Sequence, residues 1–490
     1  MEAYKFEKPS LQSAKGIAVI FVENLYKVIK NILPLFLVVA IGIFKNDHFF
    51  LEYQATIIIV LIFVFISVVI TALLKYYTFK FHIDNNHFIL NKGIFRKEVI
   101  SIQKSKIQNI HIKQNFVQQI LNVVALNIET AGDDTTEIEI KAISKPMALV
   151  LKEVLLINDK YEVDEATEND NLYFKISLKQ LILEGVSENH LTSVVLVLAL
   201  LSGIYDTLRD FIKFTHLGSF NLSASGLFES ILFNIFLFVL LLFLGFLYSL
   251  LKIFILNFNL KVVNTKAGLE ISKGLLNKVS LHVQKNKIQN IRLRTNRLKK
   301  YFSLYSLQFS QIMESKKQKE YMSIIALDDL QAHNLIDKFY KGFSENSQIH
   351  KPEKYFMRVL AIQYAIPLLL LNIPLYFVSS YLILLNIPLL TLLIWHINQS
   401  YKKNYFSIDE NYFISGSGNI IDTITDYLEL KSIQSVEFKQ TIFQKKRHLA
   451  SVVVYTAANH ITIPHIKVAM AQPIVNYLLF KTEVGDKNWM

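Results

Sequence analysis

Long apolar runs alternate along this chain with segments in which apolar and polar residues take turns. The longest charge-free run is 55–74, which reads ATIIIVLIFVFISVVITALL. As a helix rising 1.5 Å per residue, a run of this length spans the hydrocarbon layer of a bilayer, roughly 30 Å thick. The pattern therefore predicts a transmembrane helix.

The other apolar runs extend this prediction to about six transmembrane helices in three hairpins. Residues 31–44 are too few to span a bilayer alone, so the first helix is predicted to include residues of the amphipathic stretch 16–30. A loop over 45–54 is predicted to close this hairpin. The second hairpin is predicted from 191–205 and 227–256.

The third hairpin is predicted between 359 and 397. Two Asn-Ile-Pro sequences, beginning at Asn372 and Asn386, break this mostly apolar run. We expect two passes with a turn near Ser379 and Ser380. The N-terminus has acidic residues in its approach and no small-residue cleavage site, so we expect an uncleaved helix and not an export signal.

Between the hairpins the period changes to alternation, which is typical of extramembrane sheet. Phe79, Phe81 and Ile83 alternate with polar residues, 84–86 (Asp-Asn-Asn) predicts a turn, and 88–90 predicts the return strand. Further elements are predicted as strands over 98–101, 107–113, 125–130 and 137–142 and an amphipathic helix over 146–156. Several short strands and one helix describe a small barrel or sandwich.

This organisation occurs three times. The sequence KIQNI at 106–110 recurs at 287–291, and Gly93 and Gly274 precede the two motifs by the same distance. A weaker copy has KSIQSV at 431–436, preceded by Gly418, and a helix is predicted after the second and third copies over 327–340 and 465–480. We expect the motif's apolar side chains to point into three separate cores and polar neighbours such as Gln289 to face out. The apolar side chains are those of Ile107, Ile110, Ile288, Ile291, Ile433 and Val436.

These patterns divide the chain into membrane hairpins, linkers and three strand-rich domains. The predicted segments are 1–74 (N-terminal amphipathic segment and hairpin 1), 75–158 (domain 1), 159–190 (acidic linker and amphipathic segment), 191–256 (hairpin 2), 257–343 (domain 2), 344–358 (linker), 359–397 (hairpin 3) and 398–483 (domain 3).

The domains resemble the bacterial pleckstrin-homology (PH) domain of the YdbS/YdbT type, and the resemblance covers essentially the whole chain. It implies three partly open seven-stranded barrels, each closed by a C-terminal helix. The second copy departs from the pattern at Thr295, and the third lacks the compact glycine-aliphatic signature. The residues that carry the resemblance are Gly93-Ile94-Phe95, Ile107-Gln108-Asn109-Ile110, Gln114, Leu121, Ile128-Glu129-Thr130-Ala131-Gly132 and Gln440.

Composition and charge agree with a membrane protein. The chain is 52% hydrophobic with a mean hydropathy of +0.32. It contains no cysteine, which excludes disulfides, thiolate metal sites, iron–sulfur clusters and thiol nucleophiles. Lys and Arg are abundant around the three domains and the N-terminus and sparse in the hairpin tips, so we expect a multi-pass protein of the cell membrane with domains and N-terminus in the cytoplasm.

Basic residues cluster in each domain, and two interpretations stay open. Near an anionic leaflet each cation contributes roughly 1 kcal/mol, whereas solvated strand faces with ordinary positive-inside bias explain the same clusters without a ligand. Arg292 and Arg294 are alternate strand residues and should point the same way. The candidate contacts with an anionic surface are Lys92, Arg96, Lys97, Lys104, Lys106, Lys285, Lys287, Arg292, Arg294, Arg297, Lys299, Lys300, Lys445, Lys446 and Arg447.

Catalytic residues, metal ligands and cofactors are not expected. Ser415-Gly416-Ser417-Gly418 lacks the lysine of a phosphate-binding loop and predicts a turn between strands. Asp133, Asp134 and Glu137 predict a solvated hairpin tip, and 162–170 predicts an acidic linker.

The first functional hypothesis is an integral membrane binding or scaffold protein whose cytoplasmic domains engage lipid headgroups, each other or a protein partner, in envelope organisation or protection. The expected partners are membrane lipids and either another membrane protein of the YdbS type or a second copy of the chain, with no nucleic acid. The alternative is a transporter or channel component, or an accessory to one, with a pathway through the six helices, although the spans carry no ionisable series.

Overall fold

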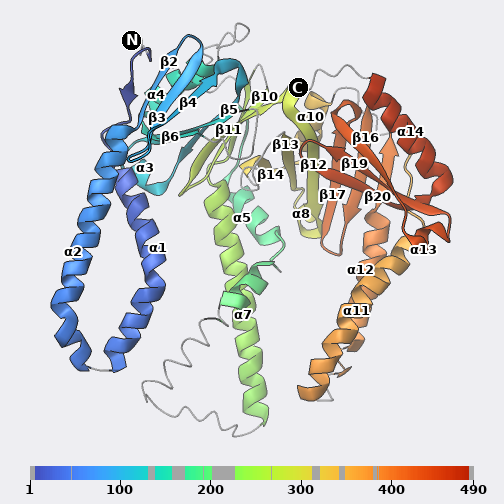
Figure 1. Ribbon diagram of the computed structural model, residues 1–490. Helices are drawn as coiled ribbons and strands as arrows, with labels where there is room; N and C mark the ends of the chain where they lie inside the picture. Colours follow the sequence, from blue (N-terminus) through green and yellow to red (C-terminus); the bar gives the residue numbers. More distant parts are fainter. Residues whose placement is uncertain are drawn as a thin grey trace. The chain divides into compact units, whose positions relative to one another are not determined.

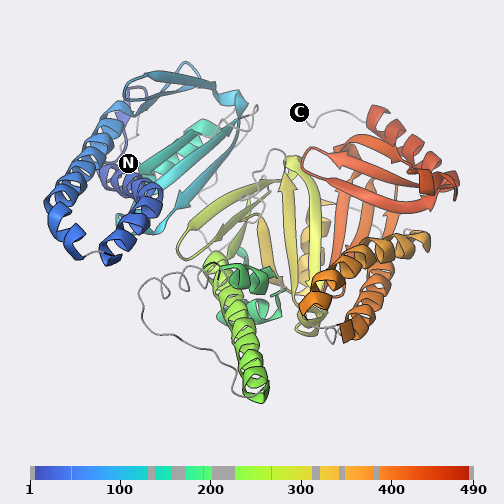
Figure 2. The same cartoon turned by 60° about the horizontal axis from the view of Figure 1, so that its bottom comes forward.

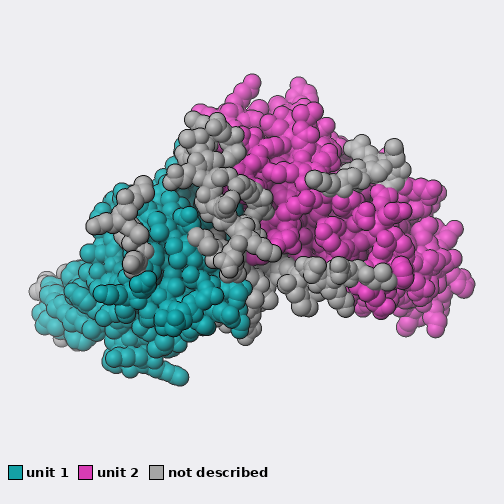
Figure 3. All heavy atoms as spheres, turned by 90° about the horizontal axis from the view of Figure 1, so that it is seen from above, with its two compact units in different colours: residues 1–171, 190–259, 272–282 teal, residues 172–189, 260–271, 283–490 magenta. Residues whose placement is uncertain are grey.

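In a computed structural model, the chain forms two compact units (Figure 3). Unit 1 comprises 1–171, 190–259 and 272–282, and unit 2 comprises 172–189, 260–271 and 283–490. The described residues are 6–45, 47–130, 138–156, 172–190, 192–200, 203, 227–265, 268–311, 321–340, 348–378, 383–384 and 386–484. The predictions for 131–137 (with Asp133, Asp134 and Glu137), for 162–170 and for Ser379 and Ser380 lie outside these residues.

The first hairpin consists of two long helices that run side by side (Figure 1). Helix α1 (Gly16–Lys45) joins the amphipathic stretch to the apolar run, as predicted, and α2 (Asp47–Thr78) returns. The predicted loop over 45–54 is wrong, because helix resumes at Asp47. The sequence from Asp47 to Gln54 has no Gly or Pro to break a helix, and it starts with an aspartate, which is favourable near a helix N-terminus.

Two described helices are long and apolar enough to cross a membrane. These segments are Ala55–Thr78, within α2, and Phe238–Asn257, within α7 (Leu227–Asn257). In unit 2, α11 (Tyr355–Val378) and α12 (Asn386–Lys403) form a further pair, and the first part of α11, Tyr355–Leu370, is a shorter apolar helix.

Copy one is built from two small sheets around one core. Asn85 and Asn86 have φ angles of 41° and 68°, so the predicted turn is confirmed. Side chains from both sheets pack together with Ala148, Leu151 and Leu155 of the following helix. The ribbon of this helix lies beside the strands of copy one (Figure 2). The predicted strands are confirmed as β2 (Lys80–Asp84), β3 (His87–Lys92), β4 (Glu98–Gln103), β5 (Ile107–Gln114), β6 (Val124–Thr130) and β7 (Ile138–Ile143), with α3 (Phe116–Ile120) and α4 (Lys145–Leu156).

Copies two and three have the same order of elements. Copy two has β9 (Lys261–Thr265), β10 (Gly268–Lys273), β11 (Lys278–Gln284), β12 (Ile288–Asn296), α8 (Arg297–Tyr301), β13 (Tyr305–Gln311), β14 (Ser323–Leu327) and α10 (Asp329–Phe339). Copy three has β15 (Tyr405–Ile408), β16 (Tyr412–Gly418), β17 (Asp422–Glu429), β18 (Ile433–Lys439), α13 (Ile442–Lys445), β19 (Leu449–Thr456), β20 (His460–Lys467) and α14 (Val468–Val484).

A short extended segment before the long helices of each copy pairs with the first strand after those helices. In copy one β1 (Ser10–Leu11) pairs with β2, and in copy two β8 (Leu172–Lys175) pairs with β9. In copy three the equivalent is a single bridge between His350 and Phe406. These segments were not predicted because they are too short to show a period in the sequence. Each repeat therefore begins before its long helices.

The motif isoleucines lie in the cores, as predicted. Ile110, Ile288, Ile291 and Ile433 are buried, and Ile107 and Val436 pack against the cores of copies one and three. The expectation that polar neighbours face out is wrong in copy two, where Gln289 and Asn290 are buried. Asn290 is turned toward copy three, where its Nδ2 donates to Asp426 Oδ1, and Gln289 lies where the register between β12 and β13 shifts, between Ile288 and Asn290.

The repeated glycines occupy equivalent turns. Gly93 and Gly274 have φ angles of 106° and 110°, and an added Cβ would lie 1.9 and 2.0 Å from a backbone carbonyl oxygen. In copy three the turn between β16 and β17 contains Asn419, whose side chain accepts hydrogen bonds from the backbone amides of Ile421 and Asp422. The predicted turn at 415–418 is wrong, because these residues belong to β16.

Candidate functional site

The copies are joined by strand pairing. In unit 2, β12 of copy two pairs antiparallel with β17 of copy three, from Ile291 opposite Tyr427 to Asn296 opposite Asp422. In unit 1, β5 of copy one pairs antiparallel with β11 of copy two, with Lys113 opposite Val279. In both places the motif strand of one copy meets the third strand of the next.

Arg292 connects copies two and three through a two-point ion pair. Its Nε and Nη2 donate to Oδ1 and Oδ2 of Asp426 at 2.8 and 3.2 Å. Asn290 Nδ2 also donates to Asp426 Oδ1, at 2.7 Å. The Asp426 side chain is only 7% exposed, so its charge depends on these donors and not on water.

Arg294 points to the same side as Arg292, as strand alternation requires, and meets two further acids. Its Nη2 lies 3.2 Å from Asp422 Oδ2 and 3.5 Å from Glu188 Oε1. Asn189 Nδ2 is 3.4 Å from the same Asp422 oxygen. Residues 188–189, which follow α5 (Leu178–Ser187), thus join the interface of copies two and three.

Lys299 lies between two glutamates. Its Nζ donates to Glu184 Oε1 at 2.6 Å and to Glu188 Oε2 at 2.7 Å, and Ser306 Oγ donates to Glu184 Oε1 at 3.0 Å. Burial alone lowers the pKa of Lys299, but the two carboxylates outweigh it and raise that pKa. Burial raises the pKa of Glu188, but Lys299 and Arg294 outweigh it and lower that pKa.

Lys299 was predicted to contact an anionic surface, but the structure buries its side chain, which is 3% exposed. The local sequence explains its position. Asn296 caps α8 by accepting a hydrogen bond from the Lys299 amide, while its Nδ2 donates to the Ser187 carbonyl at 2.6 Å. The acids were missed by sequence analysis, although Glu184 and Glu188 are four residues apart and so share a helical face.

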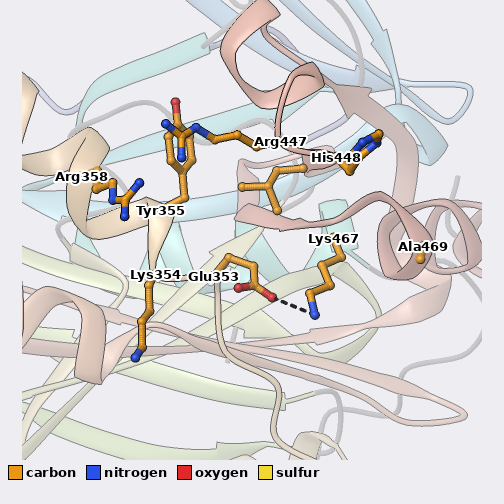
Figure 4. A pocket seen from close by; sticks show the side chains of 9 residues that line it. Glu353, Lys354, Tyr355, Arg358, Arg447, His448, Lys467 and Ala469 are labelled. Atoms are coloured by element: carbon orange, nitrogen blue, oxygen red, sulfur yellow. Dashed lines mark ion pairs between the residues drawn. The ribbon is translucent and has the colours of Figure 1, made fainter.

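A second feature is a basic pocket of about 420 Å³ in copy three. Figure 4 shows Arg447 lying across the Tyr355 ring, with a distance of 4.7 Å from Cζ to the ring centroid, and Arg358 beside it. Glu353 faces Lys467, with 3.6 Å between Oε1 and Nζ. The lining residues are Glu353, Lys354, Tyr355, Arg358, Arg447, His448, Leu449, Lys467 and Ala469.

This pocket brings Arg447, a predicted site residue, together with cations from distant segments. Arg358 is in the first turns of α11 and Lys467 ends β20. These two residues were not predicted because each is a single charge outside the basic clusters of the sequence. The nearby His465 packs edge-to-face against Tyr355, with 5.3 Å between the ring centroids, and burial lowers the pKa of His465, which favours the neutral imidazole.

The remaining predicted cations lie on exposed or half-exposed positions. In copy one Lys92 is 3.5 Å from Glu98, while Arg96 and Lys97 are exposed beside them. Arg297 lies over the Trp395 ring at 5.0 Å. Lys300, Lys445 and Lys446 are exposed. The other predicted cations lie in two equivalent 3-10 turns, Lys104–Lys106 and Lys285–Lys287, each of which directly precedes a motif strand.

The repeated two-sheet domains and the long apolar helices define a membrane protein that contains three copies of one small domain. Residues 32–157, 182–338 and 363–481 match the model of the bacterial PH domain family, so the chain belongs to this family. It is also similar to the UPF0699 transmembrane protein YdbT of Bacillus subtilis (strain 168), with 22% identity over 461 residues that cover 88% of this chain and 89% of that protein. The prediction of a YdbT-like protein with three bacterial PH domains is confirmed, and a membrane location is supported.

Proposed function

We propose that this chain is an integral cell-membrane binding and scaffold protein whose PH-like domains engage one another. The observation that carries the proposal is the pairing of β12 with β17, together with the ion pair between Arg292 and Asp426. Loss of one partner of a buried pair is costly, so this contact holds copies two and three in one register. Domains held in a fixed register at the membrane are suited to organising or protecting the envelope.

The membrane part of the proposal is six helices in three hairpins, with α4, α10 and α14 closing the three barrels. The α1–α2 and α11–α12 pairs support it. In the latter, Asn372 Nδ2 donates to Asn386 Oδ1 at 3.1 Å and Asn386 Nδ2 to Asn372 Oδ1 at 2.6 Å, which ties the two helices together. The distribution of Lys and Arg supports domains and an N-terminus that face the cytoplasm.

This topology is tested with single cysteines, because the chain has none of its own. Cysteines at Asn46, Ser223 and Ser379 should react with a membrane-impermeant thiol reagent in intact cells. Cysteines at Asn85 and Asn264 should react only after the membrane is opened. The reverse pattern would overturn the orientation.

A second candidate function, the binding of lipid headgroups, is favoured by the basic pocket. Lys354, Arg358, Arg447 and Lys467 surround it with Glu353 as the acid among the lining residues. Tyr355 begins α11, whose first part is apolar, so in the proposed topology the pocket lies where the chain enters the membrane. The adjoining α13 exposes Ile442 and Phe443 at 75% and 71%, two side chains that suit the acyl boundary of a bilayer.

The lipid candidate is tested with the full-length protein in detergent and added lipids of defined headgroup. Phosphatidylglycerol should bind more tightly than phosphatidylcholine, and salt should weaken the binding. The double variant R358Q/R447Q should lose that preference, whereas K431Q, which changes an exposed lysine paired with Glu429, should keep it. Competition by glycerol phosphate alone would identify free phosphate as the ligand, and equal binding of both lipids would overturn lipid recognition.

The remaining features of the proposal are a non-catalytic role and partners drawn from the membrane. These are lipids and either a membrane protein of the YdbS type or a second copy of the chain, without nucleic acid. The transporter hypothesis makes a different prediction. It requires solute flux across proteoliposomes that contain the purified chain, whereas a scaffold leaves them impermeable.

A further inference from the structure

The two strand pairings between copies use the same two strands of each copy, and one strand of each kind is left at the edge of a sheet. Copy one presents its motif strand β5 to the third strand of copy two, β11, and copy two presents its motif strand β12 to the third strand of copy three, β17. Within the described residues, the third strand of copy one, β4, is last in the order β1-β2-β3-β4, and the motif strand of copy three, β18, is first in β18-β19-β20.

We propose that β18 of one chain pairs antiparallel with β4 of a second copy of this chain, which continues the row of PH-like domains from molecule to molecule. The inference rests on the proposed function, in which these domains engage one another. An outer strand offers a row of backbone donors and acceptors to an added strand. The argument for a second copy as the occupant is continuity, because the same chain already makes this contact twice.

Both junctions independently give the same register for the new pair. Alignment of the copies on Ile107, Ile288 and Ile433 places Lys113, Arg294 and Lys439 at one position of the motif strand. Lys113 lies opposite Val279 and Arg294 opposite Ile424. The residue of copy one that is equivalent to both Val279 and Ile424 is Glu98. The predicted register therefore puts Lys439 opposite Glu98.

This register is chemically favourable. Lys439 and Glu98 have opposite charges and are both exposed, and the next pair, Phe438 with Val99, is apolar. Val99 is 69% exposed in the single chain, so pairing would remove apolar surface from water. Directly opposed charges and apolar pairs each stabilise an antiparallel sheet.

A side-chain contact at the first junction predicts a second point of attachment. Gln119 of α3 donates through Nε2 to the carbonyl oxygens of Leu275 and Leu276 at 3.0 and 2.9 Å. The equivalent of Gln119 in copy three is Lys445, and the equivalents of the two leucines in copy one are Ile94 and Phe95. Phe95 is 101% exposed, so its turn is open to an approaching donor. Lys445 of one chain should therefore donate to this turn in the next.

Such a contact is heterologous, because the two surfaces differ, so it generates rings or open rows of chains and not a closed symmetric dimer. The charged residues on both edges have another possible use, which is to prevent strand pairing altogether. The two readings give opposite predictions for cross-linking between chains.

The test uses engineered cysteines in the otherwise cysteine-free full-length chain in native membranes. The variant E98C/K439C should form a ladder of dimers and larger species under mild oxidation, reversed by reductant. Chains that carry only E98C, mixed with chains that carry only K439C, should stop at dimers. The out-of-register variant E98C/E437C should form at least tenfold less cross-link, because residues two positions away in the register are too distant for a disulfide.

An internal control separates this inference from the proposed function. The variant K113C/V279C places cysteines at the equivalent position of the first junction and should form a bond within one chain. If that bond fails, the engagement of copies one and two within the chain is wrong, and the pairing rule loses one of its two junctions. If it forms while E98C/K439C gives no ladder, the pairing between chains is overturned. Cross-linking of either edge to a different protein, without a ladder, overturns self-association as well.

Discussion

Replacement of Lys299 by methionine should open the contact between α5 and α8. Methionine keeps the length of the side chain but removes the cation that neutralises Glu184 and Glu188, whose side chains are 2% and 23% exposed. Removal of one partner from a buried ion pair costs about 3–5 kcal/mol, because a charge is left without compensation. At about 1.4 kcal/mol per tenfold change in an equilibrium constant, amide exchange in α5 and α8 should accelerate by more than about a hundredfold.

Hydrogen–deuterium exchange is the appropriate measurement, because a multidomain membrane protein does not unfold in one transition. The matched control is K300M, one residue away on the same helix, where the side chain is exposed. Its effect should stay within about 0.5 kcal/mol. Similar exchange in K299M, K300M and wild type would refute the claim that Lys299 stabilises this contact.

Three further predictions follow from burial, charge and backbone geometry. The pKa of Glu188 is lowered, so its stabilisation of the α5–α8 contact is present above the ordinary pKa of 4.5 and is lost as pH falls through the folded pKa. The pKa of Lys299 is raised, so its stabilisation of the same contact is present below 10.5 and is lost as pH rises through the folded pKa. Protection of α5 and α8, corrected for intrinsic exchange, should therefore be greatest between these limits. Q289D should destabilise copy two by several kcal/mol, while Q434D at the exposed equivalent position of copy three should be nearly neutral; equal exchange in their strands would contradict this. G274A should destabilise the β10–β11 turn by about 1–3 kcal/mol, because φ is 110° and the new Cβ would meet a carbonyl oxygen. Unchanged amide exchange in this turn would contradict the prediction.

Much of the fold could be predicted because its signals are local. Alternation at Phe79, Phe81 and Ile83 located the β-hairpin of copy one, and two asparagines of its predicted turn have positive φ angles. The loop over 45–54 was wrong because charged and polar residues were read as a helix end, although nothing there stops a helix. The short pairing segments before the hairpins have no period and become visible only in the sheet.

The interface could be predicted only in part. The proximity of Arg292 and Arg294 in sequence indicated a shared face, but their acceptors, Asp422 and Asp426, are more than a hundred residues away. The burial of Asn290 has the same origin, because its Nδ2 donates to Asp426 of the neighbouring copy. Contacts between copies leave no pattern within one copy, so they require the three-dimensional arrangement.

The central claim, that PH-like copies engage one another through β12 and β17, is tested most directly by a double-mutant cycle on Arg292 and Asp426. The variants R292Q, D426N and R292Q/D426N would be compared by the exchange of amides in β12 and β17. The two side chains form a two-point ion pair at 2.8 and 3.2 Å. We predict a coupling free energy of about 1.5–3 kcal/mol, so that the double variant loses markedly less protection than the sum of the single variants. Additive effects, or single variants that exchange as slowly as wild type, would contradict the claim.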